Sequence, residues 1–198
     1  FSFSPLALGG SAFAQALGQL GDETPRIEEP EYFREAFTAV QELIQRGVLT
    51  AGHDISGGGL ITALLEMCFP STKGGLSVDL TAFPEDDIVK LLFAENPGVL
   101  VQTSHPEVLE EVLRDASIGF ARIATPTADG RTLSVSYGKK STLTLDIDAK
   151  RDLWYRSSYL MDKYQSGEEL AKARYEGYKN QPLRLTAPKG FTGKLADL

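Results

Sequence analysis

The sequence predicts an α+β fold of α/β-like character, in which helices cover a mixed β-sheet and a helical extension follows at the C-terminus. Segments of helical and strand periodicity alternate over the first two thirds of the chain. Two strand-like segments then flank the turn Gly138-Lys139-Lys140. Interleaved helices and strands that end in a meander are typical of a mixed sheet. We expect one domain over residues 1–148 and an extension over residues 149–198.

The composition indicates an ordinary globular protein. The 198 residues are 42% hydrophobic and 24% charged, which is enough apolar material for a core. The net charge of −7 argues against a broad nucleic-acid surface, which needs a basic face. The sequence contains no run of 18 apolar residues and no signal peptide, so we expect no membrane span. The chain opens on Phe1 rather than methionine, so we expect a piece of a longer protein.

Two helices are predicted before the first strand. The first follows Gly9-Gly10, with Ser11 as its N-cap and apolar residues as far as Leu20. The second begins at Pro30 and ends at Gly47. Its apolar residues share one face and are Phe33, Phe37, Val40, Leu43 and Ile44. A buried strand is expected to follow and to end at Ala51.

The same periodicities predict the elements that follow. Strands are expected at 76–80, 99–102, 118–124, 131–137 and 142–147, and helices at 60–69, after Pro84 and after Ser104, which can cap. Asp129-Gly130 is a β-hairpin signal.

The C-terminal region is predicted to be helical and then irregular. A helix over 152–164 is expected to be anchored by Leu153, Trp154, Leu160 and Met161, and a charged helix over 168–178 follows it. Residues 179–198 contain two prolines and no strong period, which is typical of a linker. We expect the tail from about Gln181 to be loosely held and to be cut first by a protease.

The most informative segment is 52–60, which has the sequence GHDISGGGL. Consecutive glycines between a strand and a helix permit positive φ and the close approach of a ligand. The amides at a helix N-terminus favour an anion, and the carboxyl end of a strand is where open α/β sheets bind ligands. We therefore predict a phosphate- or nucleotide-binding site. Its residues are His53, Asp54, Ser56, Gly57, Gly58 and Gly59.

Plainer interpretations of the same segment stay open. The spacing matches neither the Walker pattern nor the dinucleotide fingerprint. Gly59 can serve only for tight strand–helix packing, and His53 can be a strand-end histidine bonded to backbone. Asp54 either holds the histidine tautomer or caps the following helix.

The sequence assigns no catalytic residue and no metal site. Its two histidines and one cysteine are too far apart for zinc. Cys68 lies among apolar helix residues, which is typical of a core position, and a single cysteine suits the reducing cytosol, so we expect a cytoplasmic protein. His105 belongs to a helix start and is left out of the site.

Five segments in this order resemble phosphoribosylformylglycinamidine synthases, the formylglycinamide ribonucleotide amidotransferases of purine biosynthesis. The glycine loop is similar to that family's His-Asp-Val-Ser-Asp-Gly-Gly-Leu motif, and residues 9–15 are similar to its Gly-Gly-Ser-Ala-Leu-Ala-Gln segment. Residues 64–67, 92–98 and 154–165 also match. The resemblance covers essentially all 198 residues.

The resemblance implies a domain similar to the C-terminal domain of aminoimidazole ribonucleotide synthetase, the second of two in the synthetase core. A linker would lead to an absent glutaminase domain. The complete ligase would convert formylglycinamide ribonucleotide, ATP and glutamine to formylglycinamidine ribonucleotide, ADP, phosphate and glutamate, and magnesium would assist ATP. The partners would be the remaining synthetase domains and the glutaminase domain. Because most ATP contacts come from the other domain type, we expect this chain alone to be inactive.

Two residues depart from the family's pattern. Gly57 stands where the family usually has Asp, and Asn96 replaces a frequent acidic residue. Aminoimidazole ribonucleotide synthetases have glycine at the first position, so we expect the turn to survive. Glu95 is expected to fix a turn rather than to bind metal.

Two other functions stay open. The chain can be a non-catalytic module that holds a structural nucleotide or frames the site. It can also belong to a different superfamily synthetase or kinase, such as a selenophosphate or thiamine-phosphate enzyme, although the tryptophan-containing helix and the linker speak against this.

Overall fold

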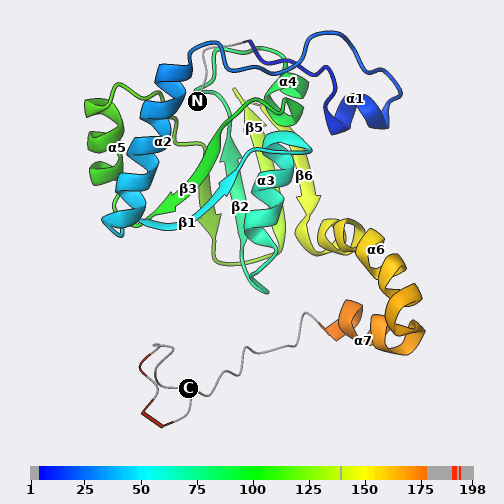
Figure 1. Cartoon of the computed structure of the whole chain (residues 1–198). Coiled ribbons are helices and arrows are strands. Elements are labelled where there is room, and N and C mark those ends of the chain that lie inside the picture. The colour runs from blue at the N-terminus through cyan, green and yellow to red at the C-terminus, as the bar shows by residue number, and fades with distance from the viewer. Residues whose placement is uncertain (1–4, 139, 178–188, 191, 193–198) are drawn as a thin grey trace. The chain divides into compact units, whose positions relative to one another are not determined.

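The computed structural model describes residues 5–138, 140–177, 189–190 and 192, and only the backbone of residues 140–142 (Figure 1). The chain divides into two compact units, Phe1–Asp152 and Leu153–Leu198. The sequence-based boundary between residues 148 and 149 stays a prediction about domain organisation. The expected loose tail lies almost entirely outside the described residues.

Helices and strands alternate along the described part of the first unit. In chain order the elements are α1 (Ala12–Ala16), α2 (Pro30–Gln45), β1 (Leu49–Asp54), α3 (Gly59–Cys68), β2 (Gly75–Asp79), α4 (Ile88–Phe93), β3 (Val99–Thr103), α5 (Pro106–Asp115), β4 (Ala124–Thr127), β5 (Thr132–Tyr137) and β6 (Lys140–Asp146). Helix α6 (Ile147–Ser166) begins in this unit, and α7 (Glu168–Gly177) follows it.

The strands form two sheets, and the larger one is mixed. Strands β1 and β3 pair antiparallel, while the four-stranded sheet has the order β4-β2-β5-β6. Strands β2 and β5 are parallel, with Leu76 opposite Leu133, and the other pairs are antiparallel. This arrangement, with helices packed on the sheets, confirms the predicted α+β fold.

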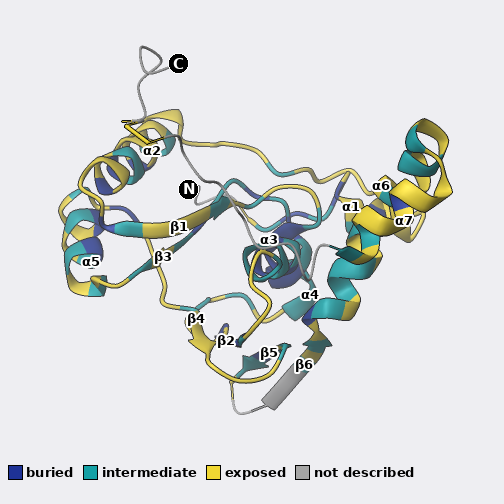
Figure 2. Ribbon diagram, turned by 90° about the horizontal axis from the view of Figure 1, so that it is seen from below, coloured by how far each residue is buried: buried dark blue, intermediate teal, exposed yellow. Residues whose placement is uncertain are grey.

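The main core lies between α3 and the four-stranded sheet, as the dark blue residues of α3 indicate (Figure 2). Helix α3 contributes Leu60, Ile61 and Leu64, because only one residue of its 60–69 segment is charged. The sheet contributes Val78, Leu133 and Val135, each at most 1% exposed. This burial fixes α3 on the sheet, and α3 carries the glycine loop at its N-terminus.

A second core joins α2 to α5, which lie side by side (Figure 1). Helix α2 has nearly the predicted bounds, but its buried residues are Ala36, Ala39 and Leu43. The predicted apolar face is not buried as a whole, since Phe37 is 55% exposed and Ile44 is 52% exposed. The small alanines face α5 because they permit close packing, which leaves the larger side chains on the neighbouring side.

Some local predictions before α5 are wrong. Strand β1 is largely exposed rather than buried, because it pairs only with β3 among the described residues. Helix α1 stops at Ala16, because Gly18 takes a φ of 67° and ends the helical path. Ser104 is not the cap of α5. Its place is taken by His105, which makes no side-chain capping bond, with proline following it.

The predicted strand at 118–124 and the hairpin at Asp129-Gly130 are also wrong. Ser117 takes a φ of 56°, and Ile118 is buried in the second core, so the strand β4 begins only at Ala124. The Asp129-Gly130 turn reverses the chain, but β2 lies between the two strands that it joins. The turn therefore sets the local direction, and burial of β2 beside β5 decides the pairing.

The described part of the second unit is a helical hairpin. The rings of Tyr159 and Tyr175 stack at 4.6 Å, and the guanidinium of Arg174 binds the carboxylate of Asp162 through two bonds of 2.7 and 2.8 Å. The predicted anchors are exposed instead, and they are Leu153, Trp154, Leu160 and Met161. Aromatic stacking and charged pairs hold the hairpin, so the prediction that these apolar residues anchor it is wrong.

In the part of the chain that the structure describes, the helices are too short or too polar to cross a bilayer.

The two leucine environments give a matched test of this packing. We predict that Leu133→Ala, at a fully buried position, lowers the free energy of unfolding by about 2–5 kcal/mol through cavity formation. Leu153→Ala, at a position that is 60% exposed, should change it by less than about 0.5 kcal/mol. Urea unfolding measures both values. Equal losses would contradict the assignment of core and surface.

The hairpin predicts a pH dependence. The bond from Arg174 holds the pKa of Asp162 below its usual 3.8, so the pair stabilises the hairpin fully above that value and less as pH falls through the folded pKa. Glu168 follows the same direction, because the Lys163 ammonium lowers its pKa. We predict that the Ala171 amide, bonded to the Gly167 carbonyl, loses hydrogen-exchange protection on acidification below about pH 4.

The matched variant is Asp162→Asn, which should lower protection at neutral pH and flatten the pH dependence. Unchanged protection of Ala171 in that variant across the range would show that the ion pair does not hold the hairpin.

Candidate phosphate-binding site at the glycine loop

The glycine loop joins the end of β1 to the start of α3. The Ile55 amide donates to the Gly98 carbonyl at 2.9 Å, which extends the pairing with the segment before β3 by one residue. The Gly59 amide donates to the Ser56 carbonyl at 2.9 Å. Gly58 occupies the N-cap position of α3 in the left-handed region, with a φ of 90° and no side-chain capping bond. The expectation that Asp54 caps the helix is therefore wrong.

The three glycines have different surroundings. A Cβ at Gly59 would lie 2.7 Å from the backbone of Leu92 and Phe93, and its φ is 71°. A Cβ at Gly58 would lie 2.2 Å from the hydroxyl of Thr62. A Cβ at Gly57 would meet nothing within 4 Å. The packing interpretation is thus correct for Gly59, with α4 rather than a strand as its neighbour, while Gly57 is open to solvent.

The amides of the loop are not equally available. The Gly58 amide donates to Oε1 of Glu95 at 2.8 Å, and the Gly59 amide is taken by Ser56. Within the described residues, neither the Gly57 amide nor the Ser56 hydroxyl has a protein partner, and both residues are exposed. The groups that remain for an anion are therefore at Ser56 and Gly57, on the outer side of the turn.

Glu95 connects the loop to the N-terminal segment. Its Oε1 also accepts the Ala12 amide, at the start of α1, at 2.8 Å. The expectation that Glu95 fixes a turn is confirmed by these two bonds. The next residue, Asn96, accepts the Ala7 amide through Oδ1 and donates from Nδ2 to the Pro5 carbonyl. A carboxylate could not make the second bond, which gives the departure at Asn96 a structural reason.

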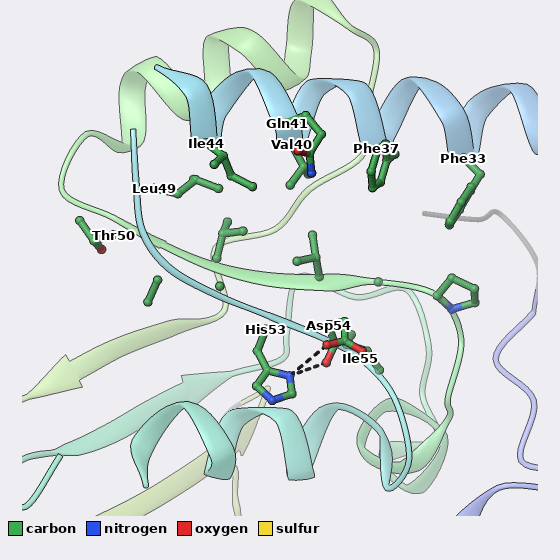
Figure 3. Close-up of a pocket in the computed structure, with 16 residues that line it drawn as sticks. Phe33, Phe37, Val40, Gln41, Ile44, Leu49, Thr50, His53, Asp54 and Ile55 are labelled. Atoms are coloured by element: carbon green, nitrogen blue, oxygen red, sulfur yellow. Dashed lines mark hydrogen bonds and ion pairs between the residues drawn. The ribbon is translucent and has the colours of Figure 1, made fainter. Parts of the chain in front are cut away.

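His53 is held by two oxygen atoms. Its Nδ1 lies 2.6 Å from the Asp54 carbonyl and 3.7 Å from the Asp54 carboxylate (Figure 3). Its Nε2 lies 3.1 Å from Oε2 of Glu66. A carbonyl can only accept, so Nδ1 carries a proton in this arrangement. The backbone of Asp54 therefore sets the tautomer more directly than its carboxylate does. The interpretation of a backbone-bonded histidine is correct for one of the two nitrogens.

Glu66 was not among the predicted site residues. It is the only charged residue of the segment 60–69, and that isolation was the available signal. When both ring nitrogens of His53 are protonated, Glu66 forms an ion pair with it. Nε2 must carry a proton to bond the Glu66 carboxylate, because two acceptors do not form a hydrogen bond.

A groove runs beside the loop, between α2 and the β1–β3 pair (Figure 3). Its volume is about 640 Å³, and its walls include Phe33, Phe37 and Val40 from α2 and Val99 from β3. His53 and Asp54 also line it. The polar residues of the loop therefore border an apolar surface.

The acidic, histidine and cysteine side chains in the described part of the chain bear on metal binding and thiol chemistry. Within the described residues, no three histidine, cysteine, aspartate or glutamate side chains gather closely enough to hold a metal ion. Burial raises the pKa of the Cys68 thiol, although the Arg131 guanidinium opposes this. Cys68 lies partly buried against the main core, which favours a packing role over a nucleophilic one.

The fold and the loop belong to a known class of synthetase domains. Residues 2–134 match the family described as AIR synthase related protein, C-terminal domain, and the chain belongs to this family. Over 179 residues it is 35% identical to the phosphoribosylformylglycinamidine synthase of Homo sapiens. That match covers 88% of this chain and 13% of the human protein, so the chain spans a small part of its relative.

Solved structures share the fold. The structure of Thermotoga maritima PurL complexed with FGAR matches with a TM-score of 0.58 and 16% identity, covering 72% of this chain and 26% of that one. PurL from the same organism complexed with ATP matches with a TM-score of 0.54 and 17% identity, covering 72% and 23%. These matches confirm the resemblance in fold to the C-terminal synthetase domain.

The different surroundings of the glycines predict different tolerance to a methyl group. Gly57→Ala should change the free energy of unfolding by less than about 1 kcal/mol, because the added atom meets open space at an unstrained φ. Gly59→Ala should lower it by about 2 kcal/mol or more, because it combines positive φ with a backbone clash. Thermal or urea unfolding measures both. A Gly57→Ala variant as unstable as Gly59→Ala would contradict this geometry.

Proposed function

We propose that this chain is part of a phosphoribosylformylglycinamidine synthase, which forms formylglycinamidine ribonucleotide from formylglycinamide ribonucleotide, ATP and glutamine. The observation that carries the proposal is the extent of the match to the human relative. It covers 88% of the chain, which is more than the family domain at residues 2–134. The similarity therefore continues toward the helical extension, and this favours the large enzyme over other superfamily synthetases and kinases.

Within that enzyme, the glycine loop would hold a phosphate group of a nucleotide. The Gly57 amide and the Ser56 hydroxyl supply donors on an exposed turn, and α3 places the positive end of its dipole behind them. His53 and Asp54 border the same turn, while Gly58 and Gly59 give the turn its shape. ATP would supply the phosphoryl group that activates an amide oxygen, and oriented donors are what such a reaction requires from the protein.

The carboxylate of Asp54 repels a bare phosphate, but it could bind a magnesium ion that accompanies the nucleotide. Magnesium is commonly bound by one or two carboxylates together with phosphate oxygens. An exposed carboxylate at the carboxyl end of β1 fits that arrangement. The described residues make no metal site by themselves, so the nucleotide would bring the remaining ligands.

The remaining parts of the enzyme would act as partners in the same polypeptide. These are the other synthetase domains, which would supply most contacts to ATP, and a glutaminase domain, which would supply ammonia. A single unpaired cysteine fits a cytoplasmic enzyme.

A second version of the proposal gives the loop an auxiliary role. Both nitrogens of His53 are engaged by protein oxygens, and the Gly58 amide is engaged by Glu95. A site whose polar groups are held in this way favours binding over proton transfer. In this version the loop holds a structural nucleotide or frames the catalytic site.

One prediction from the proposed function concerns the activity of the chain alone. We expect the purified 198-residue protein to form no formylglycinamidine ribonucleotide from formylglycinamide ribonucleotide, ATP, magnesium and ammonia, because these residues match only 13% of the human relative. Chromatographic detection of the product tests this, with the complete enzyme as positive control. Product formation above background would show that the 198 residues are sufficient for the reaction and would contradict the prediction.

Another prediction from the proposed function concerns nucleotide binding by the glycine loop in the complete enzyme. Gly57→Val should weaken nucleotide binding about tenfold, because a bulky side chain covers the free amide and one hydrogen bond is lost. Ala51→Val adds similar bulk on exposed β1 and serves as the control. Calorimetric titration with ADP and magnesium measures binding, with melting temperature as a folding check. Unchanged affinity in folded Gly57→Val would remove the phosphate site.

A further inference from the structure

We propose that Glu95 is a positioning residue of the phosphate site, acting on the loop through hydrogen bonds and not through its charge. This inference rests on the proposed function, because it concerns the same loop. Its starting point is one oxygen atom. Oε1 of Glu95 accepts the Gly58 amide, 37 residues away in the sequence, and the Ala12 amide, 83 residues away, each at 2.8 Å.

The shared oxygen fixes two segments to each other. The amide nitrogens of Gly58 and Ala12 cannot be farther apart than twice their common distance from Oε1. Contacts on both sides of Glu95 reinforce the connection. The ring of Phe93 stacks on that of Phe13 with centroids 4.5 Å apart, and Asn96 holds the backbone of Ala7. Residues 93–96 thus hold the N-terminal segment against the glycine loop.

The loop needs such a constraint because glycine lacks one of its own. Gly58 and Gly59 both take positive φ, and neighbouring glycines have many other conformations available. By holding the Gly58 amide inward, Glu95 fixes the peptide plane between Gly57 and Gly58. The Gly57 amide belongs to the preceding peptide, and it has no protein partner among the described residues, where Gly57 is exposed. The carboxylate therefore decides which amide the turn offers to a ligand.

The role requires an acceptor but no negative charge. Phosphate and carboxylate repel each other, so the charge of Glu95 opposes an anion bound at the next amide. Glutamine keeps an oxygen at the same distance along the side chain, whereas alanine removes it. A metal ligand would behave in the opposite way, because it needs the carboxylate and would lose its function in the glutamine variant.

The main experiment compares Glu95→Ala with Glu95→Gln in the complete enzyme. We expect Glu95→Ala to raise the KM for ATP about tenfold with a smaller change in kcat, and Glu95→Gln to restore KM to within about threefold of the original. Both assays are repeated over a magnesium titration. A Glu95→Gln variant as impaired as Glu95→Ala, and rescued by excess magnesium, would identify a metal ligand and overturn the proposal.

Ala12→Pro gives a second route that leaves Glu95 intact. Ala12 is the first residue of α1, where proline is tolerated, and Ser11 already has an extended backbone. Proline has no amide hydrogen, so only the bond from Ala12 to Glu95 is lost. We expect KM for ATP to rise about threefold, while Ala12→Ser, which keeps the amide, leaves KM closer to the original. Equal KM values for the two variants would contradict the coupling of α1 to the loop.

A structural readout separates this inference from the proposed function. In the 198-residue chain, Glu95→Ala should accelerate hydrogen exchange of the Gly58 amide at least tenfold, and Glu95→Gln should accelerate it much less. Slow exchange of Gly58 in folded Glu95→Ala would overturn the positioning role even if the loop binds phosphate. Failure of nucleotide binding to respond to Gly57→Val would instead overturn the phosphate site and leave the exchange result standing.

Discussion

The hydrogen bonds to Oε1 of Glu95 are the interaction on which the geometry of the glycine loop depends. The loop is rich in glycine and its N-cap residue brings no side chain, so its own sequence leaves the turn underdetermined. An acceptor from the end of α4 provides the missing constraint, and it does so at a place where Gly59 lets the α3 backbone approach α4 closely. The close approach of α3 to α4 and the hydrogen bond from Gly58 to Glu95 therefore lie at adjacent residues.

The cores explain why this small region is held firmly. Helix α3 is nearly all apolar and buries its residues against β2 and β5, which fixes the N-terminus that would face a phosphate. Its one charged residue, Glu66, is half-buried and lies 3.1 Å from Nε2 of His53. On the other side, α2 packs its alanines against α5 and leaves phenylalanines beside the loop. The polar site thus lies between a rigid helix and an apolar groove.

Much of this could be predicted from local sequence. Helix α3 and strand β2 lie within one residue of their predicted bounds, and a helix was expected after Pro84, because periodicity is a property of neighbouring residues. The contacts of Glu95 and Glu66 could not be derived in this way, because they join segments that only the packed fold brings together. The hairpin at Asp129-Gly130 was wrong for the same reason, since the strand that lies between its arms comes from residues 75–79.

The extension shows a different limit of sequence reasoning. Leu153, Trp154 and Met161 are large apolar residues of the kind that anchor a helix, yet they are exposed in the described structure. An apolar residue on a helix predicts burial only if another element is present to cover it. The sequence pattern does not show whether such an element is present. It also does not show that Arg174 and Asp162, which lie 12 residues apart, form an ion pair in the folded hairpin.

The most direct test of the account is a crystal structure of the complete enzyme with ADP and magnesium. The account predicts a phosphate oxygen within hydrogen-bonding distance of the Gly57 amide and the Ser56 hydroxyl, with Glu95 still accepting the amides of Gly58 and Ala12. A structure in which every nucleotide phosphate binds elsewhere, and in which protein covers the Gly57 amide, would contradict it. The loop would then be a packing device between α3 and α4.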